Sequence, residues 1–271
     1  MKLKIRKSCT HKSVVAGAVL TLAPAISAQA SLLAHYNFNG NTLDSSGNSY
    51  DGINNGAIFV DSNYLSFNGA DNYVSLPSGL SSGLSIFSIS LLVKTTQSVA
   101  TVLDWQNPTP IGFATGGGGS GDLQIISRNG HAGFYTGLGT EYSYTSGPAI
   151  NDGDWHNIIL TSTGSTLSLF VDGSYVNSTG VAGSLASLPF YIGAANSNFY
   201  TPSAFGHAEV SIDDVRFWDN TLTLNEIQQV AAEPPSTSIS AVPEPSGQFA
   251  LIALGSAGLF TRRRLKRTGA G

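Results

Sequence analysis

Apolar and polar residues alternate in short runs along most of the chain, and turn residues separate the runs. Ten such runs are LLAHYNFNG, YLSFNG, NYVSLP, FSISLLVKT, GDLQIIS, HAGFYTG, WHNIILTS, TLSLFVDG, PFYIGA and EVSIDDVRFW. A period of two places successive side chains on opposite faces of a sheet, so each run predicts a β-strand. Many short strands without long amphipathic helices predict an all-β fold, with two antiparallel sheets packed as a jelly-roll sandwich.

Two dipeptides mark tight turns between neighbouring runs. Asn129-Gly130 joins LQIISR to HAGFY, and Asp172-Gly173 joins LSLFV to SYVNS. Both dipeptides favour the positive backbone angles of two-residue hairpins. The sequence therefore predicts two β-hairpins at these positions.

One short helix is predicted to close the domain, in the segment TLTLNEIQQVAA. Thr223 precedes Glu226 by three residues, which is the spacing of a capping box at a helix N-terminus. Residues 31–232 are enough for one hydrophobic core, and their length does not require a second domain.

The first thirty residues have the pattern of a secretory signal peptide. Five Lys and Arg residues come first, the apolar stretch VVAGAVLTLAPAIS follows, and Ala28-Gln29-Ala30 supplies small residues for cleavage. We expect residues 1–30 to be removed and the mature chain to begin at Ser31. The alternative, an N-terminal membrane helix, is disfavoured because Pro24 interrupts the apolar run. Cys9, the only cysteine, lies in the removed segment, so we expect the exported domain to have no disulfide.

The C-terminal segment VPEPSGQFALIALGSAGLFTRRRLKR combines a Pro-Glu-Pro step, an apolar run and a basic cluster. The apolar run, residues 247–260, would form about 21 Å of helix at ~1.5 Å per residue, against a hydrocarbon core of about 30 Å. It is therefore marginal as a lasting membrane anchor. The basic cluster is expected to stay on the cytoplasmic side, so the body faces outward. Before it, residues 233–241 form an accessible linker rich in Pro and Ser.

This segment resembles the PEP-CTERM sorting signal, which we assign to residues 242–267. The motif residues are Val242, Pro243, Glu244 and Pro245. The resemblance implies a Gram-negative bacterium, passage through its inner membrane, and processing of the tail by an exosortase. The expected destination is the cell surface or the extracellular matrix. A simple C-terminal anchor is the alternative, because a short span can be tolerated by bilayer thinning.

The body between the two terminal segments is acidic. Residues 31–230 contain three Lys and Arg (Lys94, Arg128 and Arg216) and fifteen Asp and Glu, so the formal charge is 3 minus 15, or −12. Nucleic acid is excluded as a partner, because binding it depends on clustered cations. An acidic surface rich in Asn, Ser and Thr stays soluble and suits hard cations.

The order of the runs resembles a known family over residues 31–232. The most specific parts are Trp155-His156 followed by the Val171-Asp172-Gly173 hairpin, and IDDVRFW leading into LNEI. They are similar to the LamG-like jelly-roll domains, which have the concanavalin A-like fold. The resemblance implies a two-sheet sandwich that recognises carbohydrate or a surface polymer. The same sandwich also hosts glucanases.

A glycoside hydrolase would need two carboxyl groups that flank one bond at a defined separation. Glucanases of this fold carry them at alternating positions of one strand, and no run here has that pattern. The Glu residues of the body lie far apart in the sequence, at Glu141, Glu209 and Glu226. The histidines also lack the short spacings of zinc sites. We therefore expect a noncatalytic protein, with a hydrolase as the less favoured alternative.

Calcium is the metal that the sequence favours. Asp44 lies in the oxygen-rich loop DSSGNSYDG, and alternation places Asp213 on the face shared by Val215 and Phe217. A buried carboxylate without a cation is costly, and a calcium ion with six to eight oxygen ligands would offset that cost. The LamG-like resemblance implies such a site between the first loop and the last strand, at Asp44, Asn48, Asp51 and Asp213. Alternatively, backbone amides satisfy Asp213, and Asp44 and Asp51 are ordinary turn residues.

The sequence leaves two main functions open. The first is an exported module that binds carbohydrate or exopolysaccharide, and the second is a structural or adhesive matrix protein that binds other proteins. Carbohydrate recognition uses aromatic platforms and amide side chains. The available residues are Trp105, Tyr135, Tyr142, Tyr144, Tyr191 and Tyr200, with Asn107, Asn129 and Asn198. The sequence selects no pocket among them.

Overall fold

The computed structural model describes residues 30–97, 111–113, 123–138, 143–185, 187, 189–194 and 207–235 of the 271-residue chain. They belong to one compact unit, residues 1–237, and residues 238–271 form a second unit. The predicted signal peptide up to residue 29 and the linker from residue 236 lie outside the described residues, as does the whole sorting segment. Within the described residues, no helix is long and apolar enough to cross a membrane.

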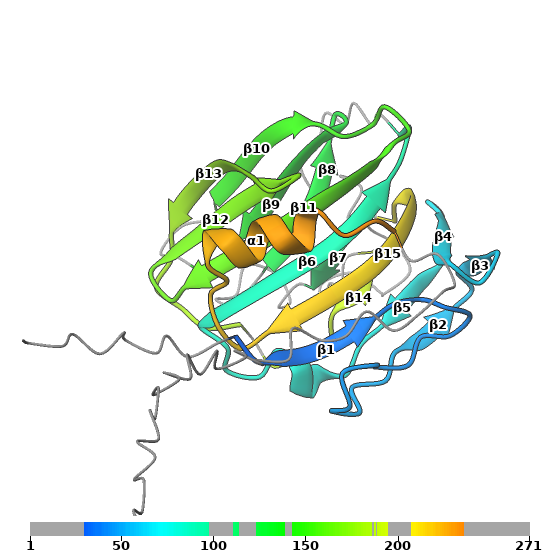
Figure 1. Ribbon diagram of the computed structural model, residues 1–271, viewed down its shortest axis with the longest axis horizontal. Helices are drawn as coiled ribbons and strands as arrows, with labels where there is room; N and C mark the ends of the chain where they lie inside the picture. The colour runs from blue at the N-terminus through cyan, green and yellow to red at the C-terminus, as the bar shows by residue number, and fades with distance from the viewer. Residues whose placement is uncertain are drawn as a thin grey trace, which may run out of the picture. The chain divides into compact units, whose positions relative to one another are not determined.

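Two antiparallel sheets form the fold (Figure 1). Sheet A consists of β1 (Leu32–Tyr36), β3 (Ile58–Val60), β4 (Tyr64–Asn68), β6 (Ile86–Lys94), β11 (Trp155–Thr163), β12 (Thr166–Val171), β13 (Ser174–Gly180) and β15 (Glu209–Trp218). Sheet B consists of β2 (Ile53–Asn55), β5 (Tyr73–Ser75), β7 (Ile111–Phe113), β8 (Leu123–Arg128), β9 (His131–Thr136), β10 (Ser143–Ala149) and β14 (Tyr191–Ile192). This architecture confirms the predicted all-β, concanavalin A-like jelly roll.

The strand order places distant parts of the chain side by side. Sheet A has the order β13-β12-β11-β6-β15-β4-β3, and β1 also pairs with β15. Sheet B has the order β10-β9-β8-β7-β14-β5-β2. The first and last strands of the domain are therefore neighbours, and β15 contacts three strands.

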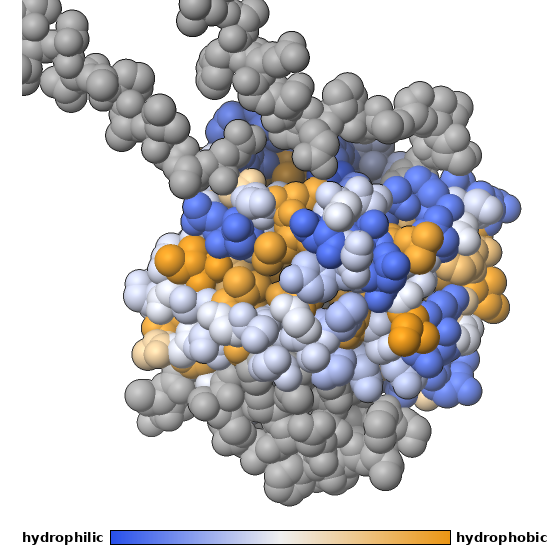
Figure 2. Space-filling view, turned by 90° about the horizontal axis from the view of Figure 1, so that it is seen from below, coloured by the Kyte–Doolittle hydropathy of each residue, from blue (hydrophilic) through white to orange (hydrophobic). Residues whose placement is uncertain are grey.

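Apolar side chains reach the surface in several places among polar ones, as Figure 2 shows for the face seen from below. The most exposed large apolar residues are Leu43, Ile53, Ile58, Ile86, Tyr175 and Leu224. Ile53 and Ile58 lie on β2 and β3, the edge strands at one side of the two sheets.

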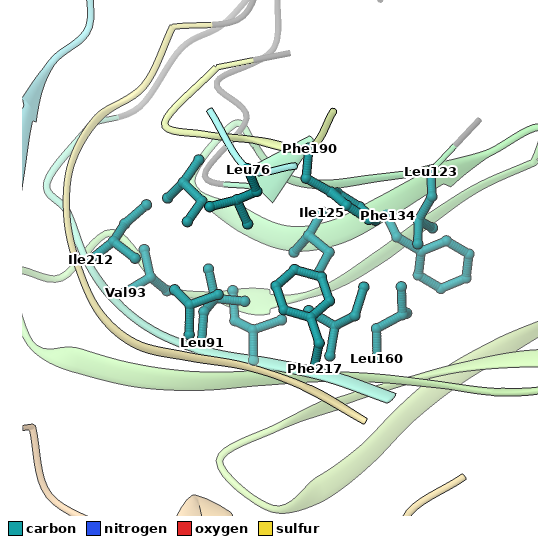
Figure 3. Packing of buried hydrophobic residues seen from close by; sticks show 14 of the residues in the cluster. Leu76, Leu91, Val93, Leu123, Ile125, Phe134, Leu160, Phe190, Ile212 and Phe217 are labelled. Atoms are coloured by element: carbon teal, nitrogen blue, oxygen red, sulfur yellow. The ribbon is translucent and has the colours of Figure 1, made fainter. Parts of the chain in front are cut away.

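The hydrophobic core fills the space between the inner faces of the sheets (Figure 3). Sheet A contributes Leu91, Val93, Leu160, Ile212 and Phe217, and sheet B contributes Leu123, Ile125 and Phe134, with Leu76 and Phe190 from the flanking segments. The ring centroids of Phe190 and Phe217 lie 5.2 Å apart, so aromatic packing joins the two layers. The alternating runs thus bury one face of each sheet, as period two requires.

Both predicted hairpins are confirmed. Asn129 (φ 52°) and Gly130 (φ 79°) join β8 to β9, and Asp172 (φ 50°) and Gly173 (φ 72°) join β12 to β13. Two consecutive positive φ values match the twist of the flanking strands. Asn and Asp tolerate this conformation better than most residues with a side chain.

Helix α1 (Leu224–Ala231) follows β15 and lies over the outer face of sheet A (Figure 1). Its capping box is confirmed, because Thr223 Oγ1 accepts a bond from Glu226 N–H and the Glu226 carboxylate accepts one from Thr223 N–H. Ile227 and Val230 pack in one cluster with Trp218 of β15. A second, smaller apolar cluster therefore holds the helix against the sheet.

Several strands were not predicted from the sequence. The strands β2, β3 and β7 have three residues each, too few to show alternation. The strand β10 contains Gly147 and Pro148 and lies at the edge of sheet B. An edge strand tolerates proline because one side of its backbone needs no partner. One 3₁₀ turn, η1 (Ser78–Leu80), was also not anticipated.

Gly193, directly after β14, offers a test of the packing between the layers. It has φ of +82°, and a Cβ there would lie 2.3 Å from Cδ1 of the buried Phe67 ring. We expect Gly193→Ala to lower the free energy of unfolding by about 2–4 kcal/mol, through overpacking and the left-handed backbone. Thermal melts should show a drop of roughly 4–16 °C. Gly180→Ala is the control, because a Cβ at Gly180 meets nothing within 4 Å. Equal melting temperatures of the two variants would contradict the predicted overpacking at Gly193.

Candidate functional site

A row of residues crosses four strands on the outer face of sheet B. Its members are direct register partners on β14, β7, β8 and β9, in the order Tyr191, Gly112, Gln124 and Tyr135. Directly paired residues of antiparallel strands lie on the same face of a sheet. Their neighbours Ile192, Ile125 and Phe134 are fully buried in the core, so the row faces away from it. We call these four residues the tyrosine row.

A tilted pair of tyrosine rings lies at one end of the tyrosine row. The Tyr73 ring of β5 lies 4.7 Å from the Tyr191 ring, with 31° between the planes. The His207 ring follows, at 6.4 Å from Tyr73. Burial raises the pKa of Tyr191, and the nearby Tyr73 raises it further. The Tyr191 hydroxyl therefore remains a neutral hydrogen-bond donor and acceptor at physiological pH.

The chemistry of the tyrosine row suits a flat ligand with many hydroxyl groups. Tyr191 and Tyr135 are half-buried, which fixes their rings on the sheet while one side stays accessible. Gln124 between them offers an amide oxygen and two amide hydrogens. Gly112 adds no side chain, and glycine inside a strand often marks close approach of a ligand.

The described part of the same face is poor in carboxyl groups. Among the side chains that the structure describes on the outer face of sheet B, none is Asp, Glu or Lys. Glycoside hydrolysis needs a pair of carboxyl groups beside the bond that breaks. The described part of this face therefore lacks the carboxyl pair that this mechanism uses.

The structure brings together some of the aromatic residues that the sequence offered. Tyr135 and Tyr191 belong to the tyrosine row, and Tyr144 takes the next register position beside Tyr135. Asn129 lies in the β8–β9 hairpin. The other candidates lie outside the described residues: Trp105, Asn107, Tyr142, Asn198 and Tyr200.

Tyr73, Gly112 and Gln124 were not predicted from the sequence as parts of a site. In GDLQIIS, Gln124 alternates with the apolar Leu123 and Ile125, so the sequence indicated that Gln124 faces away from the core. The pairing of β14 with both β5 and β7 had no such signal, because these strands are far apart in the sequence.

Asp44 of the proposed calcium set holds its own loop together. Its Oδ1 accepts bonds from the backbone N–H of His35 and of Ser46, at 3.0 and 2.8 Å. Its Oδ2 accepts from Ser46 Oγ and from Tyr50 N–H, at 2.9 and 3.0 Å. Burial raises the pKa of Asp44, but these hydrogen bonds outweigh it, and the net shift is downward.

Four donors match the roughly four lone-pair positions of one carboxylate. The Asp44 carboxylate is therefore satisfied by the protein, and it does not fit the role of a free metal ligand in this geometry. In the same loop, Asp51 Oδ1 accepts from Asp44 N–H at 2.9 Å, and the Asn48 amide donates to the carbonyls of Leu32 and Leu33. Among the described residues, no three His, Cys, Asp or Glu side chains gather as a metal-binding group. A shared calcium ion remains a prediction without support from these contacts.

The prediction that Asp213 shares the face of Val215 and Phe217 is wrong, because a β-bulge interrupts β15. Asp213 pairs with Leu92 of β6, whereas Arg216 pairs with Ser90, so β15 has one extra residue between these pairs. Asp214 at the bulge has φ of 51°. Ile212 before the bulge and Val215 after it both face the core, so the alternation changes phase there.

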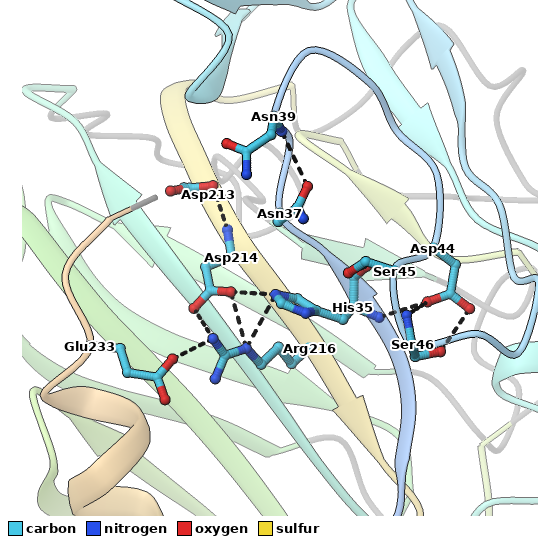
Figure 4. Close-up of polar contacts among 10 residues, drawn as sticks. All are labelled: His35, Asn37, Asn39, Asp44, Ser45, Ser46, Asp213, Asp214, Arg216 and Glu233. Carbon is cyan, nitrogen blue, oxygen red and sulfur yellow. Dashed lines mark hydrogen bonds and ion pairs between the residues drawn. The ribbon is translucent and has the colours of Figure 1, made fainter. Parts of the chain in front are cut away.

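Asp213 therefore lies on the outer face of sheet A, beside Leu92, rather than on the face of Val215 and Phe217. It is fully buried, and its Oδ1 accepts a bond from Asp214 N–H at 2.8 Å. Figure 4 shows Asp213 and Asp44 well apart, with their carboxylates engaged in different contacts.

A charged network next to the bulge joins both ends of the domain (Figure 4). His35 Nε2 of β1 lies 2.6 Å from Asp214 Oδ1, and Arg216 contacts both oxygens of Asp214, at 3.0 and 2.8 Å. Arg216 also pairs with Glu233, which follows α1. Burial raises the pKa of Asp214, yet the His35 hydrogen bond and the Arg216 charge make the net shift downward. This network was not predicted from the sequence.

His156 forms a separate polar contact at the start of β11. Its Nδ1 lies 2.8 Å from Asp172 and its Nε2 3.1 Å from Asp152. Burial lowers the pKa of His156, but the two carboxylates outweigh this effect, so the net shift is upward. Asp172 also accepts a bond from Asn157 N–H, at 2.8 Å. These contacts fix the β12–β13 hairpin, and they leave neither ring nitrogen of His156 free for a metal.

Asp44→Asn tests whether this carboxylate acts as a loop cap. The substitution turns an amide NH₂ toward groups that are themselves donors, so we expect a loss of about 1–3 kcal/mol at pH 7 and a melting temperature lower by roughly 2–12 °C. A carboxyl group whose pKa is lowered by folding stabilises above its unfolded pKa, and this stabilisation is lost as the pH falls through the folded value. The difference between wild type and variant should therefore shrink below about pH 4.

Excess chelator distinguishes the loop cap from a calcium ligand. If Asp44 acts only as a cap, the wild-type melting temperature should not change when chelator is added. A drop to the level of Asp44→Asn, with bound calcium found by elemental analysis, would contradict this assignment and restore the calcium site.

Comparison with known proteins agrees with this architecture. Residues 68–228 match the family model described as the concanavalin A-like lectin/glucanases superfamily, and residues 241–264 match the PEP-CTERM protein-sorting motif. A search of curated proteins finds no significant match.

Solved structures with a similar fold include domain 4 of AbnA, a GH43 extracellular arabinanase from Geobacillus stearothermophilus, in complex with arabinotriose. It is 21% identical, with a TM-score of 0.57, and the match covers 75% of this chain and 100% of that chain. The binding domain of Paraclostridial Mosquitocidal Protein 1 is 13% identical, with a TM-score of 0.58, and the match covers 74% and 52%. The receptor binding domain of botulinum neurotoxin D is 13% identical, with a TM-score of 0.55 and the same coverage. The match thus spans about half of each toxin domain. At these identities the likeness concerns the fold, and together with the family model it shows that the chain belongs to the concanavalin A-like lectin/glucanases superfamily.

Proposed function

We propose that this protein is an exported, noncatalytic module that binds polysaccharide at the cell surface or in the extracellular matrix. The observation that carries the proposal is the tyrosine row. Two accessible tyrosine rings flank a glycine and a glutamine on one rigid face. Aromatic faces stack on sugar rings, and the amide supplies directional hydrogen bonds.

Two further observations support a binding module. One similar solved domain was crystallised with arabinotriose, and others are described as binding or receptor binding domains. The described part of the outer face of sheet B also lacks the carboxylate pair that hydrolysis requires. Both points favour recognition of a glycan without cleavage.

The sorting motif supports the proposed location. A PEP-CTERM motif indicates export and exosortase-dependent placement at the surface or outside a Gram-negative cell. In our proposal the short apolar run of residues 247–260 holds the protein in the inner membrane only transiently. An exosortase-type enzyme then processes the tail and releases the domain.

A second candidate is a structural or adhesive protein that binds other proteins. The observation that favours it is apolar exposure at the β2 and β3 edges, where Ile53 is 66% and Ile58 is 65% exposed. Leu43 is also 55% exposed. Its neighbour Thr42 accepts a hydrogen bond from Gly52 N–H, which places the Leu43 loop beside the start of β2. Apolar residues at open sheet edges suit protein contacts.

Glycan-array binding followed by titration with the best-bound glycan tests the proposed function. We expect Tyr191→Ala and Tyr135→Ala each to weaken binding roughly thirtyfold, because each removes a stacking platform whose loss costs about 2 kcal/mol. Tyr175→Ala is the matched control, since Tyr175 is 58% exposed on β13 of the other sheet; its affinity should equal that of the wild type. Binding to no glycan on the array would overturn the proposal in favour of the protein-binding alternative.

Mass spectrometry of the native protein tests the sorting step. We expect the released protein to lack the residues after about Pro245, because the apolar run is short and the linker before it is accessible. Glu244→Ala should leave the intact chain in the inner membrane, whereas Ser240→Ala, outside the motif, should be released normally. An intact Arg-rich C-terminus on the released protein, or normal release of Glu244→Ala, would contradict exosortase processing.

A further inference from the structure

We propose that Asp219 binds the α-ammonium group that forms on Ser31 when the signal peptide is removed. The inference does not depend on the proposed function, because the mature N-terminus belongs to sheet A and the tyrosine row to sheet B. It is carried by a pair of hydrogen bonds, by the charges around Asp219 and by the place of both residues at the start of β1.

Two hydrogen bonds join Ser31 to Asp219. The Ser31 backbone nitrogen donates to Asp219 Oδ1 at 2.9 Å, and the Asp219 N–H donates to the Ser31 carbonyl at 3.1 Å. The small residues in Ala28-Gln29-Ala30 predict cleavage directly before Ser31. The nitrogen that donates to Asp219 is therefore the atom that cleavage changes from a neutral amide into an amine.

Cleavage adds a positive charge at this nitrogen. Hydrolysis of the Ala30–Ser31 peptide bond consumes one water, leaves a carboxylate on Ala30 and transfers the proton to the amino group of Ser31. An unperturbed α-amino group has a pKa of about 7.7–8.0, so it is mainly charged at pH 7. The ammonium group keeps a hydrogen for Asp219 Oδ1, and the bond becomes charge-assisted.

The charges around Asp219 favour this contact. Within the described residues, Asp219 forms no ion pair with Lys, Arg or His, whereas Asp214 and Asp172 each pair with such a side chain. A carboxylate within hydrogen-bond distance of an amine favours the charged form of the amine. The net charge of −12 over residues 31–230 adds a further attraction. The new ammonium group thus supplies a cationic partner for Asp219.

The pair lies where the first strand of the domain begins. The strands β1 and β15 lie side by side (Figure 1), and Leu32 opposite Trp218 is the first pair of their ladder. The register shifts between Leu32 and Ala34, so the ladder is interrupted directly after that pair. The bonds between Ser31 and Asp219 fasten the end of β1 that lies before this irregularity. Removal of the signal peptide therefore strengthens a contact between the first and last strands.

The rate at which the α-amino group reacts with an acylating reagent at pH 7 tests the ion pair, because only the uncharged amine reacts. The exported, naturally processed protein is used, and N-terminal sequencing should show that it begins at Ser31. Asp219→Asn keeps an oxygen acceptor and removes the charge. We expect its α-amino group to react about two- to fivefold faster than that of the wild type, the range typical of an exposed ion pair. Added salt should reduce this difference.

Three controls separate the ion pair from a general effect of charge. Asp61→Asn removes an exposed carboxylate from the β3–β4 turn, where φ of 48° suits Asn, and its α-amino group should react at the wild-type rate. One Ser inserted between Ala30 and Ser31 moves the amine away from Asp219, so Asp219→Asn should have no further effect in that background. Exposed Lys94 on β6 is read in the same experiment by peptide mass spectrometry, and its rate should be equal in all proteins.

Two results would overturn the inference. One is a mature chain that begins at a residue other than Ser31, and the other is an equal reaction rate of the α-amino group in wild type and Asp219→Asn. If Asp219→Asn is not recovered as folded protein, the one-residue insertion replaces it and should accelerate the reaction by the same factor. Neither overturning result affects the proposed function, because glycan binding is measured separately on the array.

Discussion

The β-bulge in β15 is the constraint on which the rest of the domain depends. β15 pairs with β1, β4 and β6, so every error in its register would spread through sheet A. One extra residue at Asp214 reverses the alternation, and this lets Ile212 and Val215 both reach the core. The left-handed backbone of Asp214 is costly for a residue with a side chain. The bonds from His35 and Arg216 to its carboxylate compensate for that cost and fix the bulge in place.

The same network explains how the domain closes without a disulfide. His35 comes from the first strand, Asp214 and Arg216 from the last, and Glu233 from the end of the helix. Removing one member of this partly buried network would leave an uncompensated charge on its partner. The four side chains therefore stabilise the fold only together. Helix α1 and this network occupy much of the outer face of sheet A. The outer face of sheet A also carries two aromatic pairs, Tyr64 with Trp155 and Phe170 with Tyr175, whereas the outer face of sheet B carries the tyrosine row.

Local sequence patterns were sufficient where a single segment determines the structure. Alternation predicted the long strands, Asn129-Gly130 and Asp172-Gly173 predicted their hairpins, and the spacing of Thr223 and Glu226 predicted the cap of the helix. The bulge was not predicted, although IDDVRFW carries a signal for it: two Asp residues separate the apolar Ile212 and Val215, which breaks strict alternation. The pairing of β15 with β6 locates the extra residue. For the same reason Asp213 was assigned to the wrong face. The tyrosine row needed the pairing of β14 with β7, which no local pattern encodes.

The position of the tyrosine row on strands has an energetic consequence for binding. A ligand that orders loops must offset their conformational entropy, which costs about 1–2 kcal/mol for each residue fixed. The backbone of the row is already held by ladder hydrogen bonds on both sides, and the Tyr191 ring is further restrained by its contact with the Tyr73 ring. Little of the binding energy is then needed for ordering, so a few stacking contacts and one amide are enough for a useful affinity. Catalysis would demand charged groups placed to a fraction of an ångström, whereas recognition by stacking requires only rings held at the right spacing on a preformed surface.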